Sequence, residues 1–127
     1  MKGNVNEIIA YRLTRANEAF DLAKVAIEKK YWNSAASRLY YTCFYLITAL
    51  FAKYNITTHT HKGVKAVFGL QFIKEGKIEA KWGKLFIVLF NTRQTGDYGD
   101  FAYLSEEEVL PLLKEVEEFK VMIMKLL

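Results

Sequence analysis

The sequence predicts an all-α protein, an antiparallel up-and-down four-helix bundle with an additional short helix, in one domain spanning residues 1–127. Three observations predict this fold. Apolar residues recur at intervals of three and four, which places them on one helix face. The connecting segments are short, which favours antiparallel neighbours. The chain is 52% apolar and 25% charged, a composition typical of a protein with a folded core.

The first predicted helix covers about residues 6–29. Its apolar stripe consists of Ile9, Leu13, Ala16, Phe20, Ala23 and Ile27. Asn4 or Asn6 is expected to be the N-cap, because a short side-chain oxygen can accept from a backbone N–H of the first turn. Lys29 and Lys30 suit the negative end of the helix dipole.

The second predicted helix covers about residues 34–54, with Asn33 as its N-cap. One apolar stripe consists of Ala36, Tyr40, Cys43, Ile47, Leu50 and Tyr54. The opposite side is not plainly polar, because Tyr41 and Tyr45 lie there beside Arg38. Two packed faces indicate the central helix of a bundle or a helix with one face in an interface.

The second half of the chain contains three predicted helices, at about residues 61–74, at about residues 78–94, and from Ser105 onward. Ser105 and Glu108 match the capping-box pattern at the start of the last helix. Pro111 follows its first turn. Since proline lacks an N–H and its ring clashes with the preceding turn, we expect a kink or a later helix start there.

Composition and motifs exclude several classes of protein. Cys43 is the only cysteine, so the chain can form no internal disulfide, and its apolar neighbours indicate a small core residue. We find no secretion signal and no run of 18 uncharged apolar residues, and therefore expect a cytoplasmic protein without a membrane segment. No P-loop, nucleophile elbow, zinc motif or EF-hand occurs, and we expect no cofactor.

The formal charge of +4 is unevenly distributed. Between residues 53 and 93, eight Lys and Arg stand against two Glu, whereas between residues 97 and 118 eight acidic residues stand against one Lys. The basic block could contact a phosphate backbone or an acidic partner. The alternative is a pair of solvated helix faces of opposite sign.

Arg93 lies on the apolar face of the helix predicted at 78–94. At 100° per residue it falls about 20° from Trp82, in the middle of the stripe. That stripe also contains Leu85, Phe86, Leu89 and Phe90. A charge on the core side is costly unless it is paired. One interpretation is an Arg93–Asp97 ion pair that closes the helix end, and the other is a guanidinium held in a cleft to bind a phosphate.

Other polar groups could converge on the same cleft. Arg38 lies early in the second helix, and His59 and His61 precede the third. Two histidines at a spacing of two can indicate a metal site, but no third ligand accompanies them. We therefore expect no bound metal.

Four stretches resemble the HEPN family (higher-eukaryote and prokaryote nucleotide-binding domain) in their order and spacing. They are AASRLYYTCFYLITAL, THKGV, RQTGDYGD and the acidic start of the last helix. The similarity spans nearly the whole chain and is closest to small stand-alone prokaryotic members with an Arg-x-x-x-Asp-Tyr signature. The resemblance implies a four-helix bundle with an extra short helix, often dimeric.

The resemblance also implies a function. Many family members are metal-independent endoribonucleases, with an arginine followed four to six residues later by a histidine, and commonly build the site across a dimer. Small members are often encoded beside a minimal nucleotidyltransferase as toxin–antitoxin pairs, and in some pairs the transferase adenylylates a tyrosine near that histidine. Arg93 matches the family arginine, but Tyr98 stands where the histidine is expected.

This departure matters because RNA cleavage without metal needs a base for the 2′-hydroxyl and an acid for the leaving oxygen. An imidazole serves both roles near neutral pH, whereas an unperturbed tyrosine is a poor base. His61 could supply the imidazole if the third helix folds over the same cleft. Arg93 could still stabilise the charge on a pentacoordinate phosphorus.

We therefore predict a HEPN subunit of a toxin–antitoxin-like pair with a minimal nucleotidyltransferase, binding nucleotide or RNA phosphate around Arg93, with or without endoribonuclease activity. The predicted catalytic residues are Arg93, Asp97, Tyr98 and His61, and the predicted nucleotide- or RNA-binding residues are Arg38, Tyr41, Lys62 and Arg93. The alternative is a non-catalytic nucleotide- or partner-binding homodimer whose Arg93, Asp97 and Tyr98 are structural.

Overall fold

Residues 4–127 form helical segments and contain no β-strand in the computed structural model, which describes this part of the chain. The long helices are α1 (Val5–Glu28), α2 (Trp32–Lys53), α4 (Ala80–Tyr98) and α5 (Glu106–Leu126); the shorter segments are α3 (His61–Val67) and the π-helix η1 (Phe68–Ile73). The all-α fold predicted from the sequence is confirmed. Within residues 4–127, no helix combines the length and the hydrophobicity that a membrane span requires.

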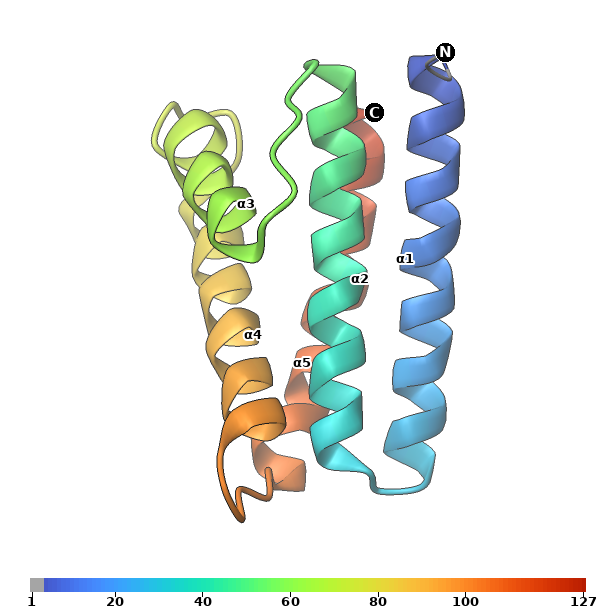
Figure 1. Cartoon of the computed structure of the whole chain (residues 1–127), viewed down its shortest axis with the longest axis vertical. Coiled ribbons are helices and arrows are strands. Elements are labelled where there is room, and N and C mark those ends of the chain that lie inside the picture. The colour runs from blue at the N-terminus through green and yellow to red at the C-terminus, as the bar shows by residue number, and fades with distance from the viewer. Residues whose placement is uncertain (1–3) are drawn as a thin grey trace.

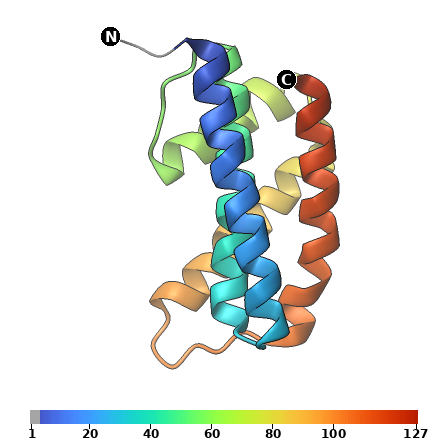
Figure 2. The same cartoon turned by 90° about the vertical axis from the view of Figure 1, so that its right-hand side faces the viewer.

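Helix α2 is central. It packs against α1, α4 and α5, and in Figure 1 it stands between α1 and α4 with α5 behind it. Successive long helices run in opposite directions, so α1 begins and α5 ends at the same end of the bundle (Figures 1 and 2). Twelve residues of α2 are buried, from both sides of the helix. The two packed faces predicted for this helix are therefore confirmed.

A group of fully buried phenylalanines joins the helices, and we call it the aromatic core: Phe51, Phe68, Phe72, Phe86 and Phe119. The ring centroids of Phe51 and Phe72 lie 5.7 Å apart, and those of Phe68 and Phe119 lie 6.1 Å apart. These are favourable distances for aromatic pairs. Cys43 is also fully buried, as predicted, and burial raises the pKa of its thiol. The thiol is therefore protonated and unsuited to be a nucleophile.

Two predicted helix starts are confirmed and one expectation is wrong. Asn4 is the N-cap of α1 and accepts from the Glu7 amide at 2.9 Å. Ser105 and Glu108 form the predicted capping box. The later start expected because of Pro111 does not occur, since α5 begins at Glu106. The capping box satisfies the first turn, and the exposed proline removes only one backbone hydrogen bond.

The regular helix predicted over residues 61–74 is wrong in its second half. α3 ends at Val67, and η1 follows with a π-type bond in which the Lys74 amide donates to the Gly69 carbonyl at 2.9 Å. The buried residues Val64, Phe68 and Phe72 recur every four positions. In a regular α-helix, residues spaced by four drift gradually around the helix, because one turn holds only about 3.6 residues. The wider π turns of η1 offset this drift, so that these residues face the core.

Helix α4 continues to Tyr98, beyond the predicted end near residue 94. Gly96 therefore lies inside the helix and does not terminate it. A Cβ at Gly96 would lie 3.1 Å from Leu104 Cδ1 and 3.5 Å from Asn33 Cα. The glycine permits close packing of α4 against the start of α2, and the longer helix places Asp97 one turn after Arg93.

Candidate functional site

The polar side chains predicted as a site lie where the last turns of α4 meet α2 and the start of α3. Arg93, Asp97 and Tyr98 belong to α4. Tyr41 lies on α2, and His61 is the first residue of α3. Segments far apart in the sequence are thus brought together by the packing of the helices.

Arg93 is a buried cation with 7% of its surface exposed. Its Nε donates to Asp97 Oδ2 at 3.0 Å, and its Nη2 donates to the hydroxyl oxygens of Tyr41 at 3.1 Å and Tyr98 at 3.3 Å. The guanidinium carbon also lies 5.3 Å from the ring centroid of Tyr40, within the range of a cation–π contact. We call Arg93, Asp97, Tyr41 and Tyr98 the Arg93 cluster. The prediction that Arg93 faces the core is confirmed.

The other terminal nitrogen of Arg93, Nη1, carries two N–H groups that no group within residues 4–127 accepts. No fully buried side-chain nitrogen in those residues lacks a partner, so Nη1 retains some contact with solvent. Arg93 lines a surface pocket together with Thr60, His61, Lys62, Phe90, Gln94 and Tyr98. A guanidinium held rigidly on one edge, with open donors on the other, is suited to an oxyanion.

His61 lies in the same pocket as Arg93. Its Nδ1 is 2.9 Å from the hydroxyl oxygen of Tyr40. Burial and, secondarily, the charge of Arg93 lower the pKa of His61. Burial raises the pKa of Tyr40, so the phenol stays protonated. His61 is therefore neutral at pH 7 and able to accept a proton.

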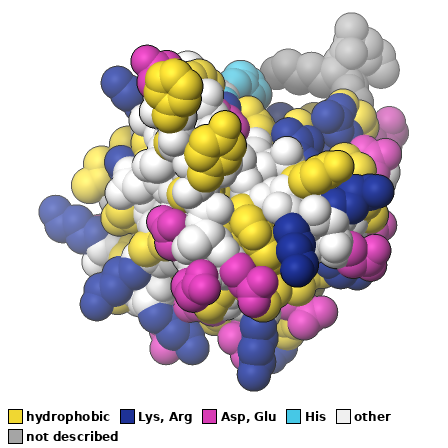
Figure 3. Space-filling model, turned by 90° about the horizontal axis from the view of Figure 1, so that it is seen from below, with side chains coloured by type: hydrophobic (Ala, Val, Ile, Leu, Met, Phe, Trp, Pro, Cys, Tyr) yellow, Lys and Arg dark blue, Asp and Glu magenta, His cyan; other side chains and the backbone are white. Residues whose placement is uncertain are grey.

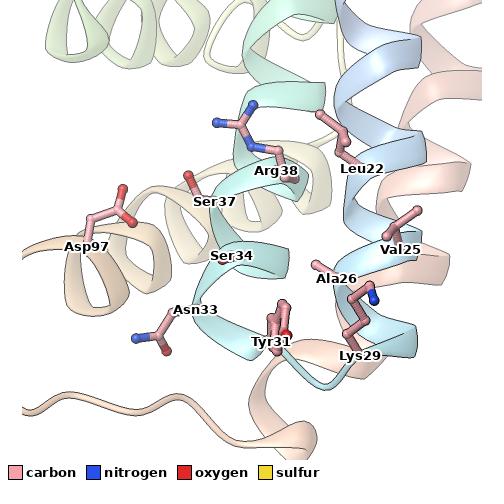
Figure 4. A pocket seen from close by; sticks show the side chains of 10 residues that line it. All are labelled: Leu22, Val25, Ala26, Lys29, Tyr31, Asn33, Ser34, Ser37, Arg38 and Asp97. Carbon is pink, nitrogen blue, oxygen red and sulfur yellow. The ribbon is translucent and has the colours of Figure 1, made fainter.

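Arg38 is set apart from that pocket. Its guanidinium carbon lies 5.0 Å from the ring centroid of Tyr41, which Arg93 also contacts at 5.1 Å. Arg38 lines an adjoining groove with Asp97 (Figure 4). The structure thus brings the predicted site residues together. Arg93, Tyr98, His61 and Lys62 line one pocket, Asp97 and Tyr41 are hydrogen-bonded to Arg93, and Arg38 lies beside them.

Tyr40 is a residue that the sequence analysis assigned to the core without a further role. It is fully buried, and its hydroxyl contacts His61 while its ring lies against Arg93. The available signal was chemical: a tyrosine on a core stripe needs a partner for its hydroxyl.

Asn33 is also different from the prediction. It lies inside α2, whose N-cap is Tyr31. The Asn33 side chain donates to the carbonyls of Gly96 at 3.2 Å and Ala102 at 2.8 Å and accepts from the Leu104 amide at 2.8 Å. The side chain is therefore used to tie the segment after α4 to α2, because its backbone is already helical.

The segment between α4 and α5 carries aromatic side chains on the surface. Tyr98 is 70% exposed, Phe101 is 94% exposed and Tyr103 is 86% exposed. Figure 3, seen from the end of the bundle with the α1–α2 turn, shows hydrophobic side chains standing out from the surface. Phe101 has a φ of 57°, which is strained for a residue with a side chain. Tyr98 belongs to the Arg93 cluster, and Phe101 and Tyr103 follow it in the chain.

Among residues 4–127, no three His, Cys, Asp or Glu side chains gather as they would around a metal ion. The ionic groups at the pocket are Arg93, paired with Asp97, and the exposed Lys62. The chemistry available is therefore anion binding by cations and proton transfer by His61.

Comparison with known proteins places this chain in a family. The model of the HEPN domain matches residues 9–126. A UPF0332 protein of Thermotoga maritima is 36% identical over 95% of this chain and 92% of its own length. A protein of Methanocaldococcus jannaschii named "Putative toxin MJ0605" is 33% identical over 91% of this chain and 86% of its own length. The chain is a HEPN domain protein.

Proposed function

We propose that this chain is the toxin-like HEPN subunit of a pair with a minimal nucleotidyltransferase, and that it binds the phosphate backbone of RNA at Arg93. The relative named "Putative toxin MJ0605" supports the toxin-like assignment. The observation that carries RNA binding is the state of Arg93, whose Nε and Nη2 are held by the cluster while Nη1 has no partner within residues 4–127 and the residue lines the pocket. A rigid guanidinium loses little conformational entropy on binding a phosphate.

Groups around Arg93 support RNA over a small anion. Lys62 lies in the same pocket and adds a second positive charge. Tyr98 lines the pocket and is an exposed ring on which an unpaired base can stack. A single strand laid over the pocket would therefore meet both cations and an aromatic platform.

The same pocket supports metal-independent cleavage as a slow accompanying reaction. A neutral His61 accepts the proton of the 2′-hydroxyl as its oxygen bonds to phosphorus, and Arg93 stabilises the charge on the phosphorus oxygens. The bond to the 5′-oxygen then breaks, and that oxygen takes a proton from water in the open pocket. With one imidazole for two proton transfers, we expect binding to be much more prominent than cleavage.

The test compares RNA binding by wild type, Arg93→Ala, Arg93→Lys and the control Lys81→Ala, using fluorescence anisotropy of a labelled single strand. Lys81 is an exposed lysine of α4 that lies over Trp82, away from the pocket. Arg93→Ala should weaken binding about tenfold or more, the scale of one charged hydrogen bond. The slope of log affinity against log salt should fall by about 0.7. The RNA affinity of Arg93→Lys should lie between that of wild type and that of Arg93→Ala. The RNA affinity of Lys81→Ala should equal that of wild type.

Equal RNA affinity of folded wild type and Arg93→Ala would contradict the proposal. Labelled RNA incubated in EDTA measures cleavage in the same samples, and identical residual cleavage by Arg93→Ala would reject the nuclease step. Co-purification of the two chains from cells that express both tests the pairing. In this pairing Tyr98, which is exposed and lies beside Arg93, is the proposed acceptor hydroxyl for the transferase.

The Arg93–Asp97 bond favours a second candidate, a non-catalytic homodimer in which the Arg93 cluster is structural. The two residues are one turn apart at the end of α4, where such a pair closes a helix. This candidate predicts that Arg93→Ala lowers the melting temperature and leaves nucleotide and RNA binding unchanged. Melting curves with and without RNA separate the two, because only binding to the native state raises the melting temperature.

A further inference from the structure

A second groove adjoins the Arg93 pocket. Arg93 lines the first pocket and Asp97 lines the groove, although these two side chains are joined at 3.0 Å. The groove encloses about 500 Å³, within the range of small-molecule sites. Figure 4 shows its side chains coming from the end of α1, the start of α2 and the last turn of α4. A ligand that extends across the Arg93–Asp97 ion pair would occupy both the Arg93 pocket and this groove.

One side of the groove is apolar. Leu22 and Val25 of α1 are 52% and 46% exposed, and Ala26 lies beside them. The ring of Tyr31 is 59% exposed at the turn between α1 and α2. A flat planar ligand can stack on such a surface, as unpaired nucleobases do on aromatic and apolar side chains.

The other side of the groove carries polar atoms that have no hydrogen-bond partner within residues 4–127. Arg38 is half-buried and makes no ion pair there, and its only cation contact is with the Tyr41 ring. Asp97 uses Oδ2 for Arg93, while its Oδ1 accepts from no described group. The hydroxyl of Ser37 is likewise unused. The groove thus offers several donors, one carboxylate oxygen and an apolar wall together.

We propose that this groove binds a nucleobase of RNA, stacked on the α1 wall, while Arg93 holds the adjacent phosphate; the placement of the phosphate rests on the function proposed above. Oδ1 of Asp97 selects bases that present an amino group. Cytosine, adenine and guanine each do so, whereas uracil presents one N–H between two carbonyl oxygens that repel a carboxylate. The groove therefore discriminates against uracil.

The test measures binding of AMP, CMP, GMP and UMP by calorimetry. Wild type should bind the three amino-bearing nucleotides about fivefold or more tightly than UMP, the scale of a specific base contact. Ser37→Leu fills the groove while every residue of the Arg93 cluster is kept, and it should remove that difference. Asn17→Leu, at an exposed position of α1 outside the groove, should retain it. Equal binding of all four nucleotides by wild type would overturn the inference.

An abasic ribose–phosphate oligomer separates this inference from RNA binding at Arg93. Ser37→Leu should bind the oligomer as wild type does, and Arg93→Ala should bind it about tenfold more weakly. If Arg93→Ala leaves oligomer binding unchanged while adenosine still binds more tightly than uridine, the phosphate site fails and the groove stands. If Ser37→Leu does not fold, the backbone amide shifts of wild type decide. AMP should move residues 34–38 and 97, and shifts confined to residues 60–62 would contradict the groove.

Discussion

The aromatic core and the Arg93 cluster share helices α2 and α4 but are held together by different forces. Phe68, Phe86 and Phe119 are each no more than 1% exposed, and the Phe68 ring contacts the other two. Such packing is stabilised mainly by the apolar area that it buries. The Arg93 cluster depends on hydrogen bonds, with Arg93 buried and Asp97 30% exposed by side chain.

The difference is informative because both regions continue one stripe of α4. Phe86 and Leu89 are buried by the same face that carries Arg93 one turn later. For the arginine, the hydrogen bonds largely offset the cost of removing a charge from water, so the net gain in stability is small. The main effect of these hydrogen bonds is to fix the position of the Arg93 guanidinium. Substitutions in the core should therefore change stability, and substitutions in the cluster should change binding.

The largest effect is expected for Phe119→Ala. Removing this fully buried ring leaves a cavity beside Phe68 and Trp82 and should lower the free energy of unfolding by about 3–5 kcal/mol. Chemical denaturation measures the change. Val121→Ala on the same helix, at a residue 53% exposed, should change it by about 0.5 kcal/mol or less. At a temperature where Phe119→Ala is folded, its RNA affinity should equal that of wild type. A lower RNA affinity of the folded variant would contradict the claim that the aromatic core affects stability and not binding.

A smaller decrease in the free energy of unfolding is expected for Asn33→Ala. This substitution tests the hydrogen bonds next to the Arg93 cluster. Asn33 makes three hydrogen bonds that tie the segment after α4 to α2. Their loss leaves part-buried backbone groups unpaired and should cost about 1–3 kcal/mol. Hydrogen exchange of the Leu104 amide should accelerate more than exchange in the aromatic core. The matched control is Asn17→Ala, an exposed helical asparagine, and equal behaviour of the two variants would show that the tie is unimportant.

Most of the fold could be predicted because helix faces follow a short period. The stripes, the Asn4 cap and the capping box at Ser105 depend on residues within a few positions of one another. The end of α4 and the π-helix η1 could not be predicted in this way. In the sequence Gly96 resembles a helix terminator, and only the packing of Asn33 and Leu104 against it explains why a glycine stands inside the helix. The wide turns of η1 depend on the core residues against which this segment packs.

The candidate site was predictable where one residue violates its own pattern. Arg93 does so by standing in an apolar stripe, and Asp97 follows at helical spacing. The partners from other helices were harder to predict, because Tyr40 fits the core pattern and Asn33 fits a cap. Their hydrogen-bond partners lie 21 residues away for Tyr40 and 63–71 residues away for Asn33. No local pattern encodes such contacts.

The smallest effect is expected from the pH dependence of His61, which faces Tyr40 and Tyr41 of α2 and Arg93 of α4. Its pKa in the folded protein is below the ordinary value of 6.5, first because of burial and then because of Arg93. The unfolded chain therefore binds the proton more readily. Stability should be constant above pH 6.5 as far as this group is concerned, and should fall as the pH drops from 6.5 to the lowered pKa.

His61→Asn should remove this decrease in denaturation curves measured between pH 7.5 and pH 5, in steps of about half a unit. His59→Asn, at an exposed histidine two residues earlier, should keep the wild-type decrease. Identical pH profiles for wild type and His61→Asn would show that burial beside Arg93 does not lower the pKa of His61.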